Sequence, residues 1–282
     1  MNNVKPTILI TGASSYAGAR IYFDLKDKYN LIGTYFNNPL SDSFLKLDLS
    51  DRDAVAQFFA DKKPDIIVHV ANFPSPRSAL GNEMNFTKLN ETSTEYIVEA
   101  CNSIGVKVVF ISSQAANNPD NIYGRLKVKS EELVKGVKAG YLILRPSLMV
   151  GFSPNTTNPR PFNRILSCLD NRSVVGEFDT SWKLQPSYVG YLSQTIEKVI
   201  QNNIWNKTIP IFINEVVTQY RIAHDILAPF GVTVAEVDQQ MDIPLSPEEL
   251  TDMNNLELAP NTYKEMIELI VEEIKNRATF KL

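Results

Sequence analysis

Tyr123 and Lys127 lie four residues apart in the segment "YGRLK", a spacing that puts both side chains on one face of a helix. About ten residues earlier, "ISSQ" places Ser112 and Ser113 directly after a short apolar segment that is typical of a buried strand. In an open α/β sheet, ligands bind beyond the carboxyl ends of the strands. A phenol, an ammonium group and a hydroxyl gathered at that edge form a candidate ligand site.

A second segment, near the start of the chain, could hold an anion. Residues Ile8 to Gly18 read "ILITGASSYAG", an apolar strand, a turn and the start of a helix. A phosphate-binding turn needs small residues for a tight turn, for close approach to a pyrophosphate and for packing of helix on strand. Gly12 and Gly18 stand at the turn and packing positions, and Ser15 replaces the usual middle glycine. An ordinary turn is the alternative. The place at the first strand–helix junction favours a dinucleotide-binding turn.

The first half of the chain alternates short apolar segments with helical ones. The expected strands are residues 7–12, 29–36, 65–71, 107–113 and 141–147. The expected helices are residues 17–29, 50–64, about 86–104, and one that starts near 122. Ser50 is the N-cap candidate of the second helix. This succession predicts an α/β fold with a Rossmann-type, doubly wound parallel sheet and right-handed crossovers.

The regular alternation stops after Ser147. The segment "VGFSPNTTNPRPF" carries three prolines and suits a loop over a cleft. A strand is expected near 208–214, returning to the sheet, and an amphipathic helix from about 262 to 277. We therefore expect residues 1–148 to form a dinucleotide-binding domain and residues 149–282 to form mainly a smaller substrate-binding region.

The bulk composition argues against several classes of partner. The 282 residues carry a formal net charge of −4, with no basic run to neutralise nucleic-acid phosphates or anionic lipids. The longest apolar segments are far shorter than the roughly 18 residues that span a bilayer, and the first strand begins too early for a signal peptide. Cys101 and Cys168 lack metal-ligand spacing, and His69 and His224 are expected in a strand and on a helix surface. We expect a cytoplasmic protein without a metal site that binds neither nucleic acid nor membranes.

Together these segments resemble the short-chain dehydrogenase/reductase superfamily. The likeness is to its extended branch of NAD-dependent epimerases and dehydratases, in particular to dTDP-4-dehydrorhamnose reductases and the related regulatory subunits of methionine adenosyltransferase. "TGASSYAG" corresponds to the family's TGxxGxxG, and "FISSQ" and "YGRLK" to its catalytic segments. "LDLSD", "VHVAN", "KLNETSTEYIVEAC" and "LRPS" match further cofactor-contacting segments.

The resemblance implies a mechanism and a set of site residues. Tyr123 would give a proton to a substrate carbonyl oxygen as hydride arrives from a nicotinamide, or take it back in the reverse direction. Lys127 would lower the pKa of the tyrosine and hold the nicotinamide ribose, and Ser113 would hydrogen-bond the carbonyl oxygen. The expected cofactor-binding residues are Gly12, Ser14, Ser15, Tyr16, Ala17, Gly18, Asn37, Asp48, Leu49, Ala71, Asn72, Asn90, Tyr123, Lys127 and Pro146.

The segment "GTYFNNP" bears on the choice of cofactor. An acidic residue after the second strand would bind the adenosine ribose of NAD, and an arginine would suit NADP, but the segment has neither. No carboxylate there repels a 2′-phosphate, and Asn37 and Asn38 could donate hydrogen bonds to it. We therefore expect NADP or NAD, with NADP slightly favoured.

The substrate side carries fewer signals. Expected substrate-binding residues are Phe73, Gln114, Arg160 and Trp182. Arg160 could clamp a substrate phosphate or be a solvated charge, and Trp182 could line the pocket or anchor a loop. Residues 113–123 form a shorter segment than in dehydrorhamnose reductases, which carry an aromatic-bearing loop there. The resemblance therefore implies the reaction class more closely than the sugar.

Three functions remain open. The first is reduction of a keto group on a nucleotide sugar or a similar polar small molecule. The second is epimerisation with a recycled NAD; dehydration is disfavoured because no Asp or Glu stands beside Ser113. The third is a non-catalytic, NADP-binding regulatory subunit, since regulatory relatives can keep Ser113, Tyr123 and Lys127. A homodimer is one expected assembly, because relatives are often dimers.

Overall fold

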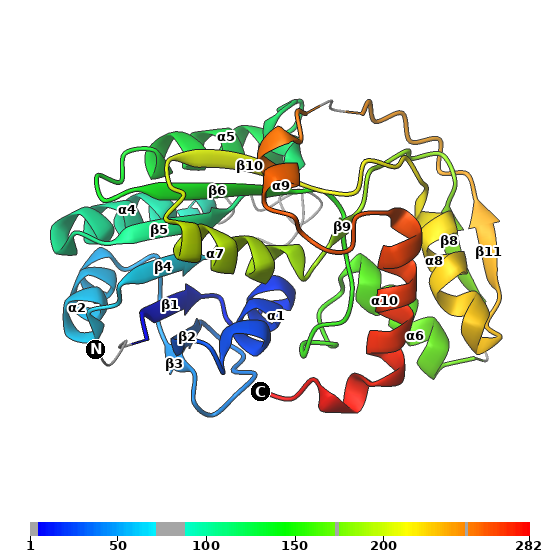
Figure 1. Ribbon diagram of the computed structural model, residues 1–282, viewed down its shortest axis with the longest axis horizontal. Coiled ribbons are helices and arrows are strands. Elements are labelled where there is room, and N and C mark those ends of the chain that lie inside the picture. Colours follow the sequence, from blue (N-terminus) through cyan, green and yellow to red (C-terminus); the bar gives the residue numbers. More distant parts are fainter. Residues whose placement is uncertain (1–4, 72–87, 173–174, 246–247) are drawn as a thin grey trace.

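Seven parallel strands form the central sheet, in the order β10-β6-β5-β4-β1-β2-β3 (Figure 1). The protein is described by a computed structural model that covers residues 5–71, 88–172, 175–245 and 248–282. The strands are β1 (Thr7–Thr11), β2 (Asn30–Tyr35), β3 (Leu45–Lys46), β4 (Ile66–His69), β5 (Lys107–Ile111), β6 (Tyr141–Pro146) and β10 (Lys207–Ile211). From β1 the chain adds β2 and β3 on one side, and from β4 it adds β5 and β6 on the other side. At such a switch point, here between β1 and β4, a doubly wound sheet opens a crevice for a ligand. The predicted fold class is confirmed.

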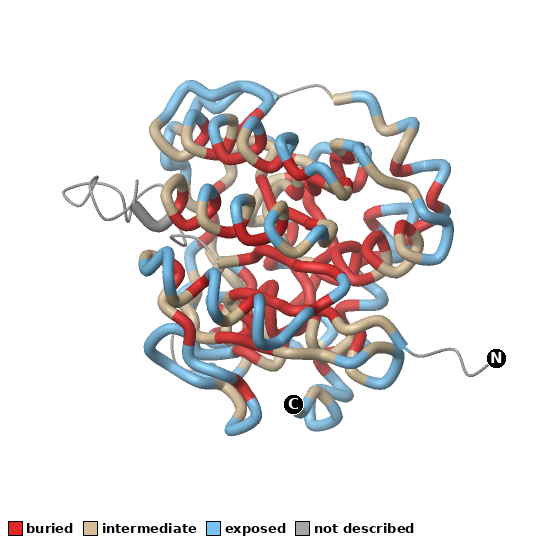
Figure 2. Tube along the Cα trace, turned by 90° about the vertical axis from the view of Figure 1, so that its left-hand side faces the viewer, coloured by how far each residue is buried: buried red, intermediate tan, exposed pale blue. Residues whose placement is uncertain are grey.

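Helices cover both faces of this sheet because its strands are apolar on both faces. Ile8 and Ile10 of β1 belong to a core shared with α1 (Tyr16–Leu25) and α7 (Tyr191–Asn202). Leu9, which points the opposite way, belongs to a second core with α2 (Arg52–Lys62), α4 (Ser93–Ile104) and α5 (Ile122–Val134). Figure 2 shows the buried segments in the middle of the molecule, with exposed segments around them.

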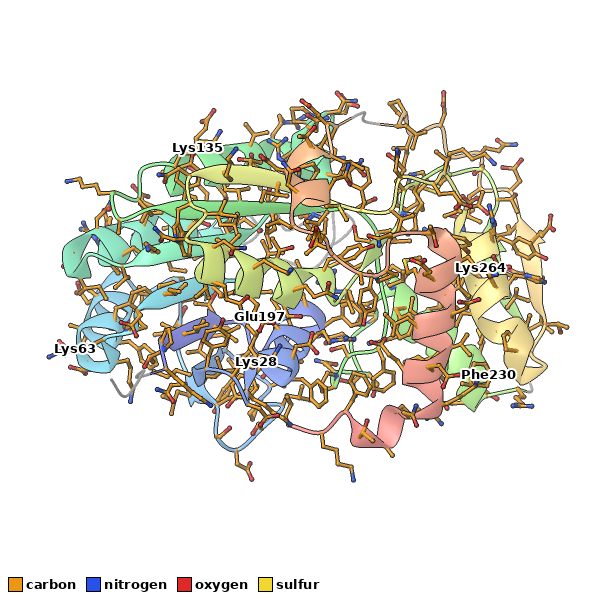
Figure 3. The ribbon with its side chains drawn as sticks, in the orientation of Figure 1. Lys28, Lys63, Lys135, Glu197, Phe230 and Lys264 are labelled. Carbon is orange, nitrogen blue, oxygen red and sulfur yellow. The ribbon has the colours of Figure 1, made fainter. Side chains whose placement is uncertain are left out.

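The two helices on the first face lie side by side. Lys28, just after α1, pairs with Glu197 of α7 at an Nζ–Oε2 distance of 2.7 Å (Figure 3). None of the helices in the described parts of the chain combines the length and the apolar character that a membrane crossing requires.

The second half of the chain adds helices and short strands at one end of the sheet (Figure 1). Its small sheets pair β7 (Met149–Val150) with β9 (Ser187–Tyr188), and β8 (Gly176–Asp179) with β11 (Val234–Val237). Besides α7, its helices are α6 (Pro161–Asp170), α8 (Gln219–Leu227), α9 (Thr251–Asn255) and α10 (Tyr263–Lys275). Short helical turns are η2 (Lys88–Thr92), η3 (Gln114–Ala116), η4 (Ala228–Phe230) and η5 (Arg277–Thr279). Strand β10 pairs with β6, at the place where the sequence predicts a returning strand.

The predicted N-cap of α2 is wrong. Asp51, not Ser50, caps α2, because its carboxylate accepts a hydrogen bond from the Ala54 N–H at 3.0 Å. The Ser50 hydroxyl instead donates to Asp48 Oδ1 at 2.7 Å. The helix expected over about 86–104 is helical throughout its described part, as a π-helix over residues 88–92 and as α4 from Ser93; its expected start lies outside the described residues.

A buried charge network joins α1 to the second half of the chain. Arg20 contacts Glu273 of α10 (Nη1–Oε1, 2.7 Å), Asp24 (Nε–Oδ2, 2.9 Å) and the Tyr188 hydroxyl (Nη2–Oη, 2.7 Å). Arg20 also donates to the Phe152 carbonyl, and Glu273 accepts the Phe152 N–H. Arg20, Tyr188 and Glu273 are almost fully buried. Removing the charge of Arg20 or of Glu273 therefore leaves buried polar atoms without one of their partners.

Replacing Glu273 by alanine is therefore expected to lower the free energy of unfolding by about 2 kcal/mol. This loss is smaller than for an isolated buried ion pair, because Arg20 retains its ion pair with Asp24. Urea denaturation measures the change. Glu272→Ala is the matched control on the same helix; its exposed pair with Lys275 is worth at most about 0.5 kcal/mol. Equal losses in the two variants would contradict the structural role of the network.

Candidate active site

The turn after β1 is built around two glycines. Gly12 has a positive φ of 67°, and a Cβ on it would lie 3.0 Å from the Ala71 Cα, just beyond β4. A Cβ on Gly18 would lie 2.2 Å from the Gly12 carbonyl oxygen, closer than any real contact. Helix α1 therefore packs directly on the turn, and both positions require glycine.

Ser15 explains why the middle glycine can be replaced. It is the N-cap of α1, and its Oγ accepts a hydrogen bond from the Gly18 N–H at 3.0 Å. Among the described residues, none accepts a hydrogen bond from the main-chain N–H of Tyr16 or Ala17. Two N–H donors at the start of a ten-residue helix suit an anionic group. The turn thus fits the diphosphate of a dinucleotide.

Helix α5 carries the tyrosine and the lysine. Asn121 caps it by accepting the Gly124 N–H at 2.9 Å, so the helix starts just before Tyr123. The Lys127 Nζ lies 5.8 Å from the centroid of the Tyr123 ring and donates to the Ile111 carbonyl at 2.9 Å. The structure thus brings the phenol ring and the ammonium group together at the carboxyl end of β5.

Lys127 is 1% exposed, and burial lowers its pKa to about 7. The carboxylate of Glu131 raises this pKa, and the Arg160 guanidinium lowers it. The protonation state of a lysine with a pKa near neutrality changes when the charges or the burial around it change slightly. Its positive charge, when present, favours the ionised form of a neighbouring phenol.

His69 is a buried strand residue, as expected. Its Nδ1 lies 2.9 Å from Thr11 Oγ1, and its Nε2 lies 3.2 Å from Thr94 Oγ1. Burial, and secondarily the charge of Lys127, lowers the pKa of His69 to about 3. The imidazole is therefore neutral at pH 7 and has a structural role.

The two serines after β5 have different partners. Ser112 is buried, and its hydroxyl donates to Glu131 Oε1 at 2.5 Å. Ser113 caps the short turn η3, with its Oγ accepting the Ala115 N–H at 3.2 Å. Because the Ser113 oxygen is an acceptor in this bond, its hydroxyl proton can still be donated to a ligand. Ser113 is the serine that suits a substrate carbonyl.

A loop from the second half of the chain covers the glycine turn. The Tyr16 hydroxyl donates to the Gly151 carbonyl at 2.5 Å, and the Ser153 hydroxyl donates to the Tyr16 carbonyl at 2.7 Å. The Asn155 Nδ2 donates to the Ser14 carbonyl at 2.5 Å. The expectation of Tyr16 as a cofactor contact therefore applies to its main chain, because its phenol is buried and used in the fold.

The same loop ends at Arg160, the N-terminal flanking residue of α6. Burial lowers the pKa of Arg160, and the nearby phenols of Tyr123 and Tyr16 raise it. Arg160 thus lies within electrostatic reach of both phenols, and of Lys127, whose pKa it lowers. No cluster of His, Cys, Asp or Glu in the described part of the chain could hold a metal ion.

The family model of the RmlD substrate binding domain matches residues 6–252. The chain belongs to this family. Among curated relatives, methionine adenosyltransferase 2 subunit beta of Xenopus tropicalis is 26% identical over 157 residues, which are 51% of this chain and 47% of that relative. The uncharacterized protein MJ1055 of Methanocaldococcus jannaschii is 31% identical over 129 residues, 38% of this chain and 40% of that one. The chain matches about half the length of the first of these relatives.

Solved structures of similar fold cover nearly the whole chain. The dTDP-4-dehydrorhamnose reductase of Bacillus anthracis in complex with NADP has a TM-score of 0.76 at 20% identity, covering 97% of this chain and 100% of that one. The UDP-glucose 4-epimerase of Thermotoga maritima with UDP-glucose has a TM-score of 0.78 at 17% identity, covering 96% and 99%. These likenesses show that the chain has the same fold as these two proteins.

The remaining expected cofactor residues lie at several places in the fold. Asp48 and Leu49 follow β3, and the Asp48 carboxylate accepts the Ser50 N–H at 2.8 Å. Asn37 is exposed just after β2, and Pro146 is buried at the end of β6. Asn90 is buried in η2, and its carbonyl accepts the hydroxyls of Thr94 and Ser130. Ser14 Oγ accepts the Leu40 N–H, which ties the loop after β2 to the glycine turn.

The expected substrate residues are only partly brought together. Gln114 starts η3 beside Ser113, and Arg160 lies near Tyr123. The main-chain N–H of Trp182 donates to the buried Asp179 (N–Oδ2, 2.7 Å), and the Trp182 side chain packs, partly buried, against the core. Asn72 and Phe73 lie outside the described residues.

Sequence reasoning missed Asn155, Ser153 and Glu131. The signal for Glu131 was present, because it continues the four-residue spacing of Tyr123 and Lys127. The partners of Ser153 and Asn155 lie more than 130 residues away in the chain, and no local pattern indicates them.

Proposed function

We propose that the chain is an NAD(P)-dependent oxidoreductase that reduces a keto group on a nucleotide sugar or a similar polar small molecule. The observation that carries this proposal is the pairing of Tyr123 with a buried Lys127 at the strand edge that also presents Ser113. The glycine turn supports it, because its packing and its open N–H groups suit a diphosphate. Similar folds belong to reductases and epimerases, one of them in complex with NADP.

A nicotinamide dinucleotide, when bound at this site, would supply the hydride. The N–H groups of Tyr16 and Ala17 hold the diphosphate at the start of α1. Ser113 donates a hydrogen bond to the substrate carbonyl oxygen and orients it. Tyr123 gives its phenolic proton to that oxygen as negative charge develops. The Lys127 ammonium stabilises the phenolate that remains.

We propose NADP as the slightly favoured cofactor, because the segment directly after β2 carries Asn37 and no carboxylate. Replacing Asn37 by aspartate is expected to weaken NADPH binding about tenfold through repulsion of the 2′-phosphate, with NADH binding unchanged or improved. Fluorescence titration with both cofactors measures this. Asp42→Asn, on the same exposed loop, is the control. A parallel loss of NADH and NADPH affinity in Asn37→Asp would contradict the assignment.

The division of labour within the chain is also a proposal. We assign cofactor binding to residues 1–148 together with β10, and substrate binding mainly to residues 149–282. The position of Arg160 near Tyr123 supports this division, because it brings a cation from the second half to the proposed reaction centre.

A second candidate is a regulatory subunit that binds NADP without turnover. The observation that favours it is the similarity to methionine adenosyltransferase 2 subunit beta, over about half of each chain. Epimerisation with a recycled NAD is a third candidate, favoured by the fold likeness to UDP-glucose 4-epimerases.

One set of assays separates the three candidates. The isolated protein is analysed for bound nicotinamide and then supplied with NADPH or NADH and a panel of keto-sugar nucleotides. Cofactor consumption matched by alcohol formation supports the reductase. Tightly bound NAD without net consumption, with interconversion of sugar epimers, supports the epimerase. Binding without any turnover, unchanged by Tyr123→Phe, supports the regulatory subunit and contradicts the main proposal.

A further inference from the structure

Glu131 lies one helical turn beyond Lys127, on the same face of α5, and is almost fully buried. Both of its carboxylate oxygens are held. Arg145 of β6 binds it in a bidentate manner, with Nε–Oε1 at 2.9 Å and Nη2–Oε2 at 2.7 Å. Ser112, directly after β5, donates to Oε1 at 2.5 Å. One carboxylate thus connects α5 with the carboxyl ends of two neighbouring strands.

We propose that Glu131 is a positioning residue of this site: its carboxylate stabilises the ammonium form of Lys127, and its bond with Ser112 fixes the strand end that presents Ser113. The proposal deepens the proposed function, because Lys127 and Ser113 are the groups through which Glu131 would act. It names no new substrate, and its test needs no turnover.

Burial and the Arg160 charge disfavour the ammonium form of Lys127, and the Glu131 carboxylate favours it. On its own helix Lys127 faces Tyr123 and Glu131, on β4 it faces His69, and from the loop before α6 it faces Arg160. His69 is neutral at pH 7, and Arg160 opposes a second positive charge. The contacts on β5 are the Ile111 carbonyl and the Phe110 ring, which carry no net charge. Among these described neighbours, Glu131 is the one whose negative charge favours the buried ammonium.

Arg145 fixes the position of the Glu131 carboxylate relative to Lys127. Because Arg145 and Ser112 bind the two carboxylate oxygens, the negative charge of Glu131 is held in a fixed position, one helical turn from Lys127. The lysine Nζ remains bound to the Ile111 carbonyl and close to the Tyr123 ring. Arg145 is shared with Glu248 (Nη1–Oε1, 3.0 Å), a second carboxylate on the far side of the guanidinium.

The test is a pH titration of Lys127 by NMR, on the full chain with ¹³Cε-labelled lysine and no cofactor. The Lys127 signal is assigned by its loss in Lys127→Met. In Glu131→Gln the titration midpoint is expected to fall by about one pH unit or more, because the opposing charge is gone. Glu248→Gln is the matched control: it removes the other carboxylate bound to Arg145, and the midpoint is expected to stay within about 0.3 unit of wild type.

Equal shifts in Glu131→Gln and Glu248→Gln, or no shift in either, would overturn the proposal. If Glu131→Gln does not fold, the triple variant Glu131→Gln/Arg145→Leu/Glu248→Gln removes the three joined charges together and leaves none of them unpaired. A fall of the midpoint in the same direction is expected in it, reduced by the loss of the Arg145 cation, and an unchanged midpoint would overturn the proposal. A fall of the midpoint in a protein that reduces no keto compound would leave this inference standing and reject the reductase.

Discussion

Replacing Tyr123 by phenylalanine is expected to lower kcat/KM for keto reduction at least about 100-fold, because a positioned proton donor contributes that much or more to such a step. The ring remains, so the contact with the Lys127 ammonium and the packing of α5 are kept. Affinity for NADPH is therefore expected to change by less than about threefold, since the lost hydroxyl acts mainly in the transition state. Steady-state kinetics and a cofactor titration on the same preparation measure the two quantities.

The matched control for this prediction is Tyr220→Phe. Tyr220 is a partly buried tyrosine on α8, packed against the core and against His224. Removing its hydroxyl is expected to leave kcat/KM unchanged. Comparable losses in both variants would mean that the phenol of Tyr123 has no special part in the reaction.

The second large effect is expected from Gly18→Ala. The added Cβ would lie 2.2 Å from the Gly12 carbonyl oxygen, which belongs to the main chain and cannot rotate away. The turn and the start of α1 must then separate, and the N–H groups of Tyr16 and Ala17 move from the diphosphate. Losing two charge-assisted hydrogen bonds is expected to weaken NADPH binding at least about 100-fold. Overpacking is expected to lower the free energy of unfolding by about 1–3 kcal/mol.

Gly105→Ala separates these two effects. Gly105 also has a positive φ, of 71°, but a Cβ on it would meet nothing within 4 Å. A left-handed alanine is expected to cost about 1 kcal/mol of stability, with cofactor affinity unchanged. Calorimetric titration with NADPH and urea denaturation cover both quantities. Unchanged NADPH affinity in Gly18→Ala would remove the glycine turn from the cofactor site.

The sheet could be predicted because its signals are local. Ile8, Leu9 and Ile10 are all apolar, which is typical of a parallel strand covered on both faces, and the structure buries each of them completely. The four-residue spacing of Tyr123 and Lys127 likewise fixes their common face from the sequence alone. Ser113, at the end of the strand before this helix, could therefore be placed beside Tyr123 and Lys127.

Choices between adjacent polar residues were less predictable. Ser50 and Asp51 are both good N-cap residues, and the sequence does not show that Asp48 engages the serine. Ser112 and Ser113 follow the same strand, and only the buried Glu131 distinguishes their partners.

Most individual contacts between the two halves of the chain could not be predicted. Tyr16 was expected to contact the cofactor, but its phenol binds the Gly151 carbonyl, 135 residues away. The sequence indicates a loop over a cleft that contains Arg160, but it does not show that Asn155 binds the Ser14 carbonyl or that Arg160 lies near Tyr123 of α5. Such contacts depend on how the halves pack, and no periodicity records them.

The most direct test of the central claim is a single-turnover experiment. Protein in excess is mixed with NADPH and a keto-sugar nucleotide, and loss of absorbance by NADPH is followed together with the mass of the sugar product. We predict one alcohol formed for each NADPH oxidised in the wild-type protein, and at least about 100-fold slower oxidation in Tyr123→Phe. NADPH that binds both proteins equally and is oxidised by neither, across the whole panel of keto sugars, would contradict the claim that Tyr123 and Lys127 form the centre of a reductase.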